Sequence, residues 1–407
     1  MRRQETIRAR AGTNLGGASA HNRRVIVDAL RINGALSRAD LARATRLTKQ
    51  TVSNIMDELE RESIVRAQAT VRIARGQPIT PYELVPDGAF ALGLQIDRHV
   101  ARVIAVDLVG AVRAQLEEAV PSDDPESGLE IVLRLVEEAR RQLQAGHGRD
   151  APRLVGLGLA MPGPFGVSGI EDNPWVMSRW QTFPLVERLA ERTGLEVVLQ
   201  NDAAAAATAE KLVGAANGLE SAVCLFLGYG LGAGLILNGE LYTGFHGNAG
   251  EVGMALLPAL TGGSAGELAP LEHRASLASF AKAFGIDPST VDLFDAVEQR
   301  AGQPSPELDD WLTDAAQGLG WAIHMLESLF DPQTIILCGG APRNLLDHLV
   351  QRIMPLKASI ANRDERRLPR LQIGLADRWS VALGAAAEPI SRAFDPRFSA
   401  ILKNEAV

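Results

Sequence analysis

The segment Leu47–Leu59, which reads LTKQTVSNIMDEL, decides the fold of the N-terminal part of the chain. Thr48 is a favourable N-cap, and apolar residues recur after it at helical spacing, so one side of a helix can be buried in a small core. The opposite side carries short polar and amide side chains that can hydrogen-bond to base edges and phosphates in a major groove. A solvated amphipathic helix without any role in DNA binding would show the same pattern, so the neighbouring segments decide between the two interpretations.

Two further helices are predicted ahead of this segment. His21–Asn33 has apolar residues on one side and ends before Gly34, a residue typical of helix C-termini. Ser37 then caps a second helix, and Asp40 stands three residues later, as in a capping box. Residues 1–20 are predicted to be a disordered tail.

After the third helix the sequence predicts a wing, which completes a winged helix-turn-helix domain over residues 21–85. Two short strands are expected at 66–73 and 80–84, around a turn that contains Gly76 and Pro78. Arg72 and Arg75 on this wing are placed to contact the DNA backbone or the minor groove. The predicted DNA-binding residues are Ser37, Thr48, Lys49, Gln50, Thr51, Ser53, Asn54, Arg72 and Arg75.

The charge of the chain is unevenly distributed. The net charge is −8, from 41 basic and 49 acidic residues. Residues 1–85 contain 15 basic and 8 acidic residues, a net charge of +7, which leaves 26 basic and 41 acidic residues, a net charge of −15, for the remainder. A basic N-terminal part (the head, residues 21–85) followed by an acidic remainder is typical of a DNA-binding domain joined to a domain that does not contact DNA.

The composition is that of a cytoplasmic globular protein. Hydrophobic residues make up 46% of the 407 residues and charged residues 22%, which leaves room for two or three domains. No apolar run approaches the ~18 residues that a membrane-spanning helix needs, and the N-terminus lacks the apolar region of a secretory signal. Cys224 and Cys338 lie in apolar, strand-like runs and are interpreted as small core residues.

From Phe90 onward the pattern changes to an α/β domain, predicted over residues 86–400. Three strands are followed by strands that alternate with helices, and a long helix is expected from Pro306 behind its N-cap Ser305. The arrangement suggests two lobes with a binding cleft between them: lobe 1 at about 86–205 with a C-terminal helix at 378–395, and lobe 2 at about 206–377. The predicted strands are 90–97, 100–108, 111–118, 154–160, 195–200, 222–227, 235–238, 334–338 and 371–375.

Six short motifs in this second part are more specific. They are Met161-Pro162-Gly163-Pro164, Asn173-Pro174-Trp175, Gln200-Asn201-Asp202-Ala203-Ala204-Ala205, Gly228-Tyr229-Gly230-Leu231-Gly232-Ala233-Gly234, Gly250-Glu251-Val252-Gly253 and Cys338-Gly339-Gly340-Ala341. They resemble the ROK family, which joins sugar kinases with transcriptional repressors, and the resemblance covers residues 22–395. It implies a two-lobed actin/hexokinase-like (ribonuclease H-like) fold that forms a homodimer or homotetramer. A winged head before this domain is similar to the family's sugar-responsive repressors.

The resemblance implies which residues bind a sugar in the cleft. A sugar presents adjacent hydroxyls, so its site needs acceptors and amides that converge from several loops. Each of the five residues named at the end of this paragraph could instead be an ordinary cap of a helix or turn. In the family's kinases, the residue that matches Asp202 is the general base that takes the proton of the attacking hydroxyl. The sugar-binding residues expected from the resemblance are Asn173, Asn201, Asp202, Glu251 and Glu272.

The chain departs from the family at two places. The family's zinc-binding His and three Cys correspond here to Met254, Gly263, Ala265 and Pro270, none of which supplies a zinc ligand, so no structural zinc and no other cofactor is expected. The kinase phosphate loop Asp-x-Gly-Gly-Thr reads Asp97-Arg98-His99-Val100-Ala101, and Tyr229 replaces the usual Thr of the second loop. Phosphate loops depend on a close approach of the backbone, which side chains with a Cβ obstruct.

These patterns favour a cytoplasmic regulator that binds an operator in double-stranded DNA and senses a sugar. They also predict that kinase activity has been lost. As a repressor of carbohydrate uptake or catabolism genes it would have the sugar as effector and no membrane partner. An active ATP-dependent sugar kinase with an appended DNA-binding domain is the alternative, which the Asp97–Ala101 loop argues against. A third interpretation makes the large domain a purely structural dimerisation domain without a ligand. The presence of Asn201, Asp202 and Glu251 argues against it.

Overall fold

The computed structural model describes residues 15–71, 78–147, 152–169, 177–258, 268–290, 292–354 and 356–393, with side chains from residue 21 onward. The chain divides into two compact units, Met1–Gly88 with Ser391–Val407, and Ala89–Ile390. The boundary lies within a few residues of the predicted end of the head at residue 85. Among the described residues, no helix combines the length and the apolar character that crossing a membrane requires.

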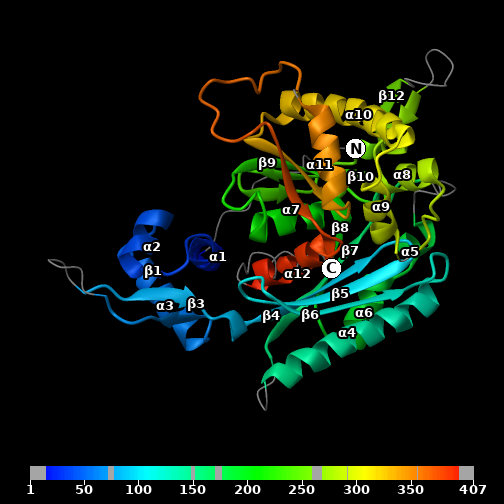
Figure 1. The fold of residues 1–407 in the computed structure, drawn as a ribbon. Coiled ribbons are helices and arrows are strands. Elements are labelled where there is room, and N and C mark those ends of the chain that lie inside the picture. The colour runs from blue at the N-terminus through cyan, green and yellow to red at the C-terminus, as the bar shows by residue number, and fades with distance from the viewer. Residues whose placement is uncertain are drawn as a thin grey trace, which may run out of the picture. The chain divides into compact units, whose positions relative to one another are not determined.

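The first unit is a winged helix-turn-helix, as predicted (Figure 1). Its helices pack around a core of buried Ile26, Leu41, Ile55 and Leu59. The three short strands form one sheet in the order β1-β3-β2, and the bridge between Val71 and Ile79 extends the β2–β3 wing. The elements are α1 (Leu15–Asn33), β1 (Leu36–Ser37), α2 (Arg38–Thr45), α3 (Lys49–Arg61), β2 (Val65–Ala67) and β3 (Pro81–Leu84), followed by the 3-10 turn η1 (Pro86–Gly88).

The predicted caps are confirmed, whereas the predicted N-terminal tail is too long. Ser37 and Asp40 form the capping box of α2, and Thr48 caps α3 by accepting a hydrogen bond from the backbone N–H of Thr51 at 3.1 Å. Helix α1 begins at Leu15, so residues 15–20 belong to the helix that was expected to start at His21. Arg72 and Arg75 at the tip of the wing lie outside the described residues.

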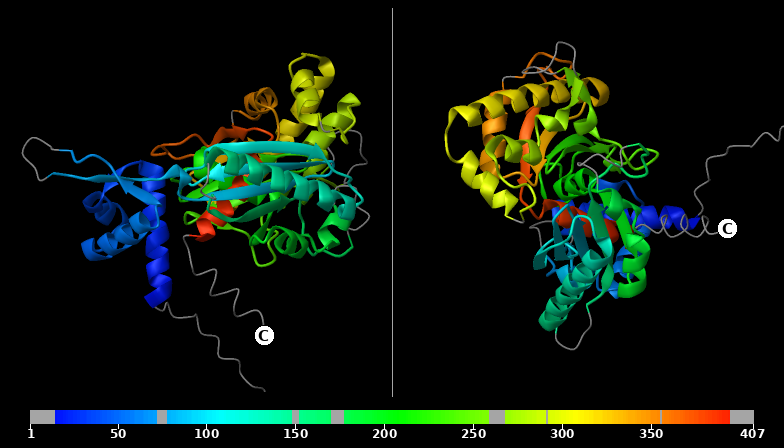
Figure 2. Two further views of the ribbon diagram at one scale, coloured as in Figure 1. Left: turned by 90° about the horizontal axis from the view of Figure 1, so that it is seen from below. Right: turned by 90° about the vertical axis from the view of Figure 1, so that its right-hand side faces the viewer.

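Lobe 1 of the second unit is a five-stranded sheet with helices on both faces. The strand order is β6-β5-β4-β7-β8, with β4, β7 and β8 parallel. Helix α4 covers one face with α6, and α12 lies on the other face (Figures 1 and 2). The elements are β4 (Phe90–Ile96), β5 (Val100–Asp107), β6 (Val112–Ala119), α4 (Pro125–His147), β7 (Leu154–Met161), α5 (Ser178–Thr182), α6 (Leu185–Thr193), β8 (Val197–Asn201) and α12 (Ser380–Ala393).

Lobe 2 repeats this arrangement with the sheet order β11-β10-β9-β14-β15. Helices α8 to α11 build a large apolar core on one face, and α7 packs on the other face. Cys224 and Cys338 are buried on the α7 side, as expected of small core residues. The elements are α7 (Asp202–Val213), β9 (Ser221–Leu227), β10 (Leu231–Leu237), β11 (Glu240–Tyr242), η2 (Val252–Met254), β12 (Leu256–Pro258), β13 (Leu268–Pro270), η3 (Leu271–His273), α8 (Leu277–Phe284), α9 (Leu293–Ala301), α10 (Pro306–Phe330), β14 (Thr334–Gly339), α11 (Arg343–Ile353) and β15 (Leu371–Ala376).

Two predictions about lobe 2 are corrected. Strand β10 begins at Leu231, four residues before the predicted start, because this glycine-rich stretch pairs along its whole length with β9. Helix α7 belongs to lobe 2 from Asp202 onward, so the boundary between the lobes precedes residue 205. The reason is steric: a Cβ on Gly234 would collide with Ala207 and with the carbonyl oxygen of Ala203, so only glycine admits the helix this close.

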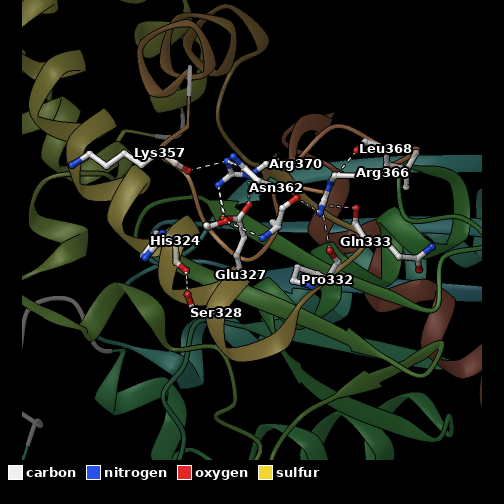
Figure 3. Close-up of polar contacts among 12 residues, drawn as sticks. His324, Glu327, Ser328, Pro332, Gln333, Lys357, Asn362, Arg366, Leu368 and Arg370 are labelled. Carbon is white, nitrogen blue, oxygen red and sulfur yellow. Dashed lines mark hydrogen bonds and ion pairs between the residues drawn. The ribbon is translucent and has the colours of Figure 1, made fainter. Parts of the chain in front are cut away.

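A buried ion pair holds the C-terminal end of α10. The side chain of Glu327 has no exposed surface, and that of Arg370 is 13% exposed. Arg370 Nε and Nη2 donate to the two Glu327 carboxylate oxygens at 2.7 and 2.6 Å, and Ser359 Oγ donates a further bond at 2.6 Å (Figure 3). Burial alone would raise the pKa of Glu327, but these bonds hold the pKa below its usual value. The pair therefore ties the segment before β15 to helix α10.

Replacing Glu327 by alanine is expected to destabilise the protein strongly, because Arg370 would stay buried without its partner. Breaking one side of a buried pair typically costs about 3–5 kcal/mol. Arg363→Ala is the matched control, because Arg363 pairs with Asp331 at 2.9 Å while both side chains are about half exposed, and such pairs contribute roughly 0–1 kcal/mol. Urea titrations of both variants measure the free energy of unfolding; equal losses would contradict the assigned role of Glu327.

Candidate functional sites

The exposed side of α3 presents three of the predicted DNA-binding side chains. Lys49, Gln50 and Asn54 are exposed, and Gln50 Nε2 donates to Asn54 Oδ1 at 2.8 Å. This bond orients two amides one turn apart, so that they present donors and acceptors together. Amide side chains in this orientation suit bidentate contacts to adenine. The recognition-helix assignment therefore agrees with the geometry of the head.

The other predicted side chains of the head have internal roles. Ser37 is 7% exposed and its hydroxyl donates to Asp40 at 2.5 Å, so it serves as the cap of α2, and its contact with DNA stays a prediction. Thr48 and Thr51 are linked at 2.8 Å between their hydroxyls. Ser53 accepts a bond of 2.7 Å from Arg38, which also pairs with Asp57. These contacts help to hold α3 in place within the head.

In the second unit, the N-terminus of α7 brings the predicted cleft residues together. Asn201 caps α7 through its side-chain oxygen, which accepts from the backbone N–H of Ala203 at 2.8 Å. Its amide nitrogen donates to Glu251 Oε1 at 2.8 Å, a bond between residues of the two lobes. The capping alternative is thus confirmed for Asn201, and its assignment to a sugar site stays a prediction. Asn201, Asp202, Glu251 and Glu272 line one pocket.

The loop that closes this pocket is held in place by two amide side chains. Gln181 Nε2 donates to the carbonyl oxygen of Pro162 at 2.9 Å. Asn248 makes two bonds of 2.8 Å to Phe165, one to its N–H and one to its carbonyl oxygen. Gly163 lies so close to Glu251 and Asn201 that a Cβ there would collide with both. Sequence reasoning missed the roles of Gln181 and Asn248, because their partners are backbone atoms distant in sequence.

The carboxyl groups of the pocket are unusually basic. Asp202 keeps part of its surface open to the cleft, but burial first, and then the charges of Asp97 and Glu251, raise its pKa to about 8. Burial, followed by the charge of Glu272, raises the pKa of Glu251 to about 7. Burial also raises the pKa of Glu272, while the N–H of Leu231 and the charge of Arg98 act against it. Perturbed carboxyls that share a cleft are typical of a functional site.

Arg98 occupies the space beside these carboxyls. It stands in the tight β4–β5 turn, where the N–H of Asp97 bonds to the carbonyl oxygen of Val100 at 2.9 Å. Arg98 is 8% exposed, pairs with Asp97 at 3.3 Å, and its guanidinium lies 3.9 Å from the centroid of the Tyr229 ring. Tyr229 belongs to the β9–β10 turn of lobe 2, so this cation–π contact joins the lobes. Arg98 is the cation that the sequence did not single out.

Arg98 also separates two small cavities. The cavity with Asn201 and Asp202 measures about 40 Å³, and the one beside His99 and Tyr229 about 70 Å³. Arg98 lines both cavities, so the position of its side chain limits the space in each of them.

Two predictions cannot be placed in this geometry. Asn173, expected on the sugar, lies outside the described residues, as do Gly263 and Ala265 of the family's zinc loop. Met254, at the position of the zinc-binding His, lines the same pocket as Glu251 and Glu272. A thioether is a poor zinc ligand. Because two positions of the zinc loop lie outside the described residues, the absence of a structural zinc stays a prediction.

The raised pKa values predict how stability depends on pH. A carboxyl whose pKa is raised in the folded state keeps its proton to higher pH than in the unfolded chain, so its contribution to stability is lost as pH rises from about 4 towards about 8. Asp202→Asn mimics the protonated form and is expected to exceed the wild type in stability at pH 8 by about 1–3 kcal/mol, with a smaller difference at pH 5. Denaturant titrations at both pH values measure this, with exposed Asp310→Asn as control. A constant difference between Asp202→Asn and wild type would contradict the assignment.

Comparison with known proteins places this architecture in a family. The ROK family model matches residues 91–387. A putative xylose repressor of Caldicellulosiruptor sp. (strain Rt8B.4) is 26% identical over 78% of this chain and 82% of its own length, and a glucokinase of Thermotoga maritima is 30% identical over 56% of this chain and 78% of its own. The crystal structure of a ROK family transcriptional regulator, a homologue of the E. coli Mlc protein, shares the fold with a TM-score of 0.67 at 23% identity, covering 93% of this chain and 97% of that one. Because the family model spans nearly all of the second unit, this chain belongs to the ROK family.

Proposed function

We propose that this protein is a transcriptional regulator, a repressor of carbohydrate uptake or catabolism genes, whose binding to double-stranded DNA responds to a sugar or sugar derivative. The observation that carries the proposal is the presence of two sites in one chain. One is the exposed α3 face with its oriented Gln50–Asn54 pair, and the other is the carboxylate and amide cluster around Asn201 and Asp202. The relative named as a putative xylose repressor matches 78% of this chain, whereas the glucokinase matches 56%.

The effector site is assigned to the pocket at the N-terminus of α7. Asn201, Glu251 and Glu272 converge there from three separate segments, which is what recognition of adjacent sugar hydroxyls requires. Asn173 completes this set by resemblance. Burial raises the pKa of Asp202 to about 8 and that of Glu251 to about 7, and a sugar hydroxyl that hydrogen-bonds to these carboxyls would replace the hydration that burial removes.

The Arg98–Tyr229 contact supports a loss of kinase activity. In the kinases that the chain resembles, two glycine-containing turns approach the phosphates of ATP. Here the first turn carries Arg98 and His99, and the guanidinium of Arg98 fills the space in front of Tyr229 in the second turn. Both turns are thus occupied by side chains at the point where backbone amides would have to reach phosphate oxygens.

The same contact suggests how the sugar influences DNA binding. Arg98 joins lobe 1 to Tyr229 of lobe 2, and Asn201 joins the lobes through Glu251. A sugar that displaces Arg98 changes the balance between lobe arrangements. In a homodimer or homotetramer such a change alters the spacing of two heads, which bind half-sites about 34 Å apart. The sugar shifts DNA affinity by its differential affinity for the arrangements, typically ~1–3 kcal/mol.

An operator titration with and without the cognate sugar tests this function. For the wild type the sugar is expected to change operator affinity by about 5–150-fold. Asp202→Asn keeps the shape of the side chain but replaces one carboxyl oxygen by an amide nitrogen, which can neither accept a hydrogen bond from a sugar hydroxyl nor exchange a proton, so it should abolish most of this response and leave sugar-free DNA binding nearly unchanged. Gln50→Ala is the complementary variant, expected to reduce discrimination against a mutated operator by ~1–3 kcal/mol while keeping the sugar response. An undiminished response in Asp202→Asn would remove Asp202 from the effector site.

An ATP-consumption assay over a panel of sugars separates the regulator from the sugar kinase. We expect no sugar-dependent production of ADP above background, because side chains occupy both phosphate turns. Asp202→Asn is the control that distinguishes true turnover from contamination, since a kinase of this family would lose its general base. Turnover in the wild type that this variant lacks would establish the kinase instead.

A further inference from the structure

A hollow lies beside helix α10 and the turn η3, and it shares no lining residue with the pocket around Asn201 and Asp202. Its volume is about 860 Å³, within the roughly 300–1,000 Å³ of sites that bind small molecules. The space is open because α10 carries Ala316 and Gly320 along it, residues with little or no side chain. A Cβ built on Gly320 would meet nothing within 4 Å. The hollow is therefore a candidate site of its own, with room for a small organic molecule.

Four cationic side chains border this hollow, and they come from three segments of the chain. One follows η3, one stands in the last turn of α11, and two belong to the segment between α11 and β15. Among the described residues that line the hollow, none is acidic. An anion in this space is therefore attracted from several sides and is repelled by no lining carboxylate. The four cations are Arg274, Arg352, Lys357 and Arg370.

Two of these cations retain charge that a ligand can use. Arg274 is 8% exposed; one of its nitrogens donates to the carbonyl oxygen of Pro258, and its ion pair with Asp314 spans 4.0 Å. Within the described residues Lys357 forms no ion pair, and Figure 3 shows its side chain pointing away from Arg370. The other two cations are paired with carboxylates of α10. Burying a cation that has only a distant partner is costly, so an anion beside Arg274 would stabilise it.

The wall of the hollow that α10 forms suits a ring. Gln317, Trp321 and His324 line it at helical spacing, so they stand on one face of the helix. Trp321 is 42% exposed, and an indole ring can stack on a nucleobase or on the apolar face of a sugar ring. The exposed side chains of Gln317 and His324 add hydrogen-bonding groups beside it. The hollow thus combines a platform for a ring with cations that suit a phosphate.

We propose that this hollow binds a small phosphorylated ring compound, a nucleoside monophosphate or a sugar phosphate, independently of the cleft. Its phosphate contacts Arg274 and Lys357, because guanidinium and ammonium groups both bind phosphate oxygens through charge-assisted hydrogen bonds. Its ring packs on Trp321. Arg274 directly follows η3, whose Glu272 lines the pocket around Asn201. The ligand therefore lies beside the turn that contributes to the proposed effector site, while its binding does not depend on that site.

Isothermal titration calorimetry of the full-length protein, without DNA or sugar, tests the site with three probes. They are adenosine 5′-monophosphate, glucose 6-phosphate and inorganic phosphate. One of the two ring compounds is expected to bind with a Kd below about 1 mM and at least about tenfold more tightly than inorganic phosphate, because Trp321 contributes only when a ring is present. The compound that binds identifies the class of ring. Absence of binding by both ring compounds, or equal binding of inorganic phosphate, overturns the proposal.

Two variants locate the bound compound. Gly320→Leu fills the hollow and is expected to weaken binding at least about tenfold without loss of thermal stability, because leucine favours a helix more than glycine does and its Cβ meets open space. Lys357→Ala removes a phosphate contact and should also weaken binding at least about tenfold. Lys282→Ala is the control, because Lys282 is an exposed lysine of α8 that does not line the hollow. Binding that survives both Gly320→Leu and Lys357→Ala takes place elsewhere, for example in the cleft, and the proposal is then wrong.

Discussion

The close contact between α7 and the sheet of lobe 2 is the constraint on which the cleft depends. Gly234 of β10 leaves room for Ala203 and Ala207, so the helix lies nearly against the strand. This contact places the N-terminus of α7 at the junction of the two sheets. Asn201 then caps the helix and at the same time binds Glu251, 50 residues further along the chain. A larger side chain on the strand would push the helix away and separate these groups.

The electrostatics of the cleft explain why a sensor and a kinase can share one framework. Three partly buried carboxyls lie around Asn201, and burial is the main cause that raises the pKa of each, with charge repulsion adding to it for Asp202 and Glu251. In a kinase of the family, the residue that matches Asp202 would accept the proton of the attacking sugar hydroxyl, with the phosphates of ATP bound nearby. Here the nearest cation is Arg98, held by Asp97 and the Tyr229 ring. The site thus presents carboxyl and amide groups of the kind that hydrogen-bond to hydroxyls, and the side chain of Arg98 fills the neighbouring space.

The head illustrates how reliably short-range signals predict structure. The caps at Ser37 and Thr48 and the helix Lys49–Arg61 follow from residues within a few positions of one another, and the structure confirms them. The structure shows in addition that the capping hydroxyl of Ser37 is nearly buried, which the sequence did not indicate. The early start of α1 was missed since the stretch before His21 contains glycines, which lower helix propensity.

The sequence by itself determined the order of domains, most strands, the helix caps and the chemical types of the cleft residues. These depend on local propensity, on the period of apolar residues and on recognisable motifs. Only the tertiary structure decided that Asn201 reaches Glu251, that Gln181 and Asn248 hold the loop at Pro162 and Phe165, and that Arg98 stacks on Tyr229. Each of these contacts joins segments far apart in the chain. Whether such a contact forms depends on how closely the helices and strands pack, and side-chain volumes determine that distance only in the folded protein.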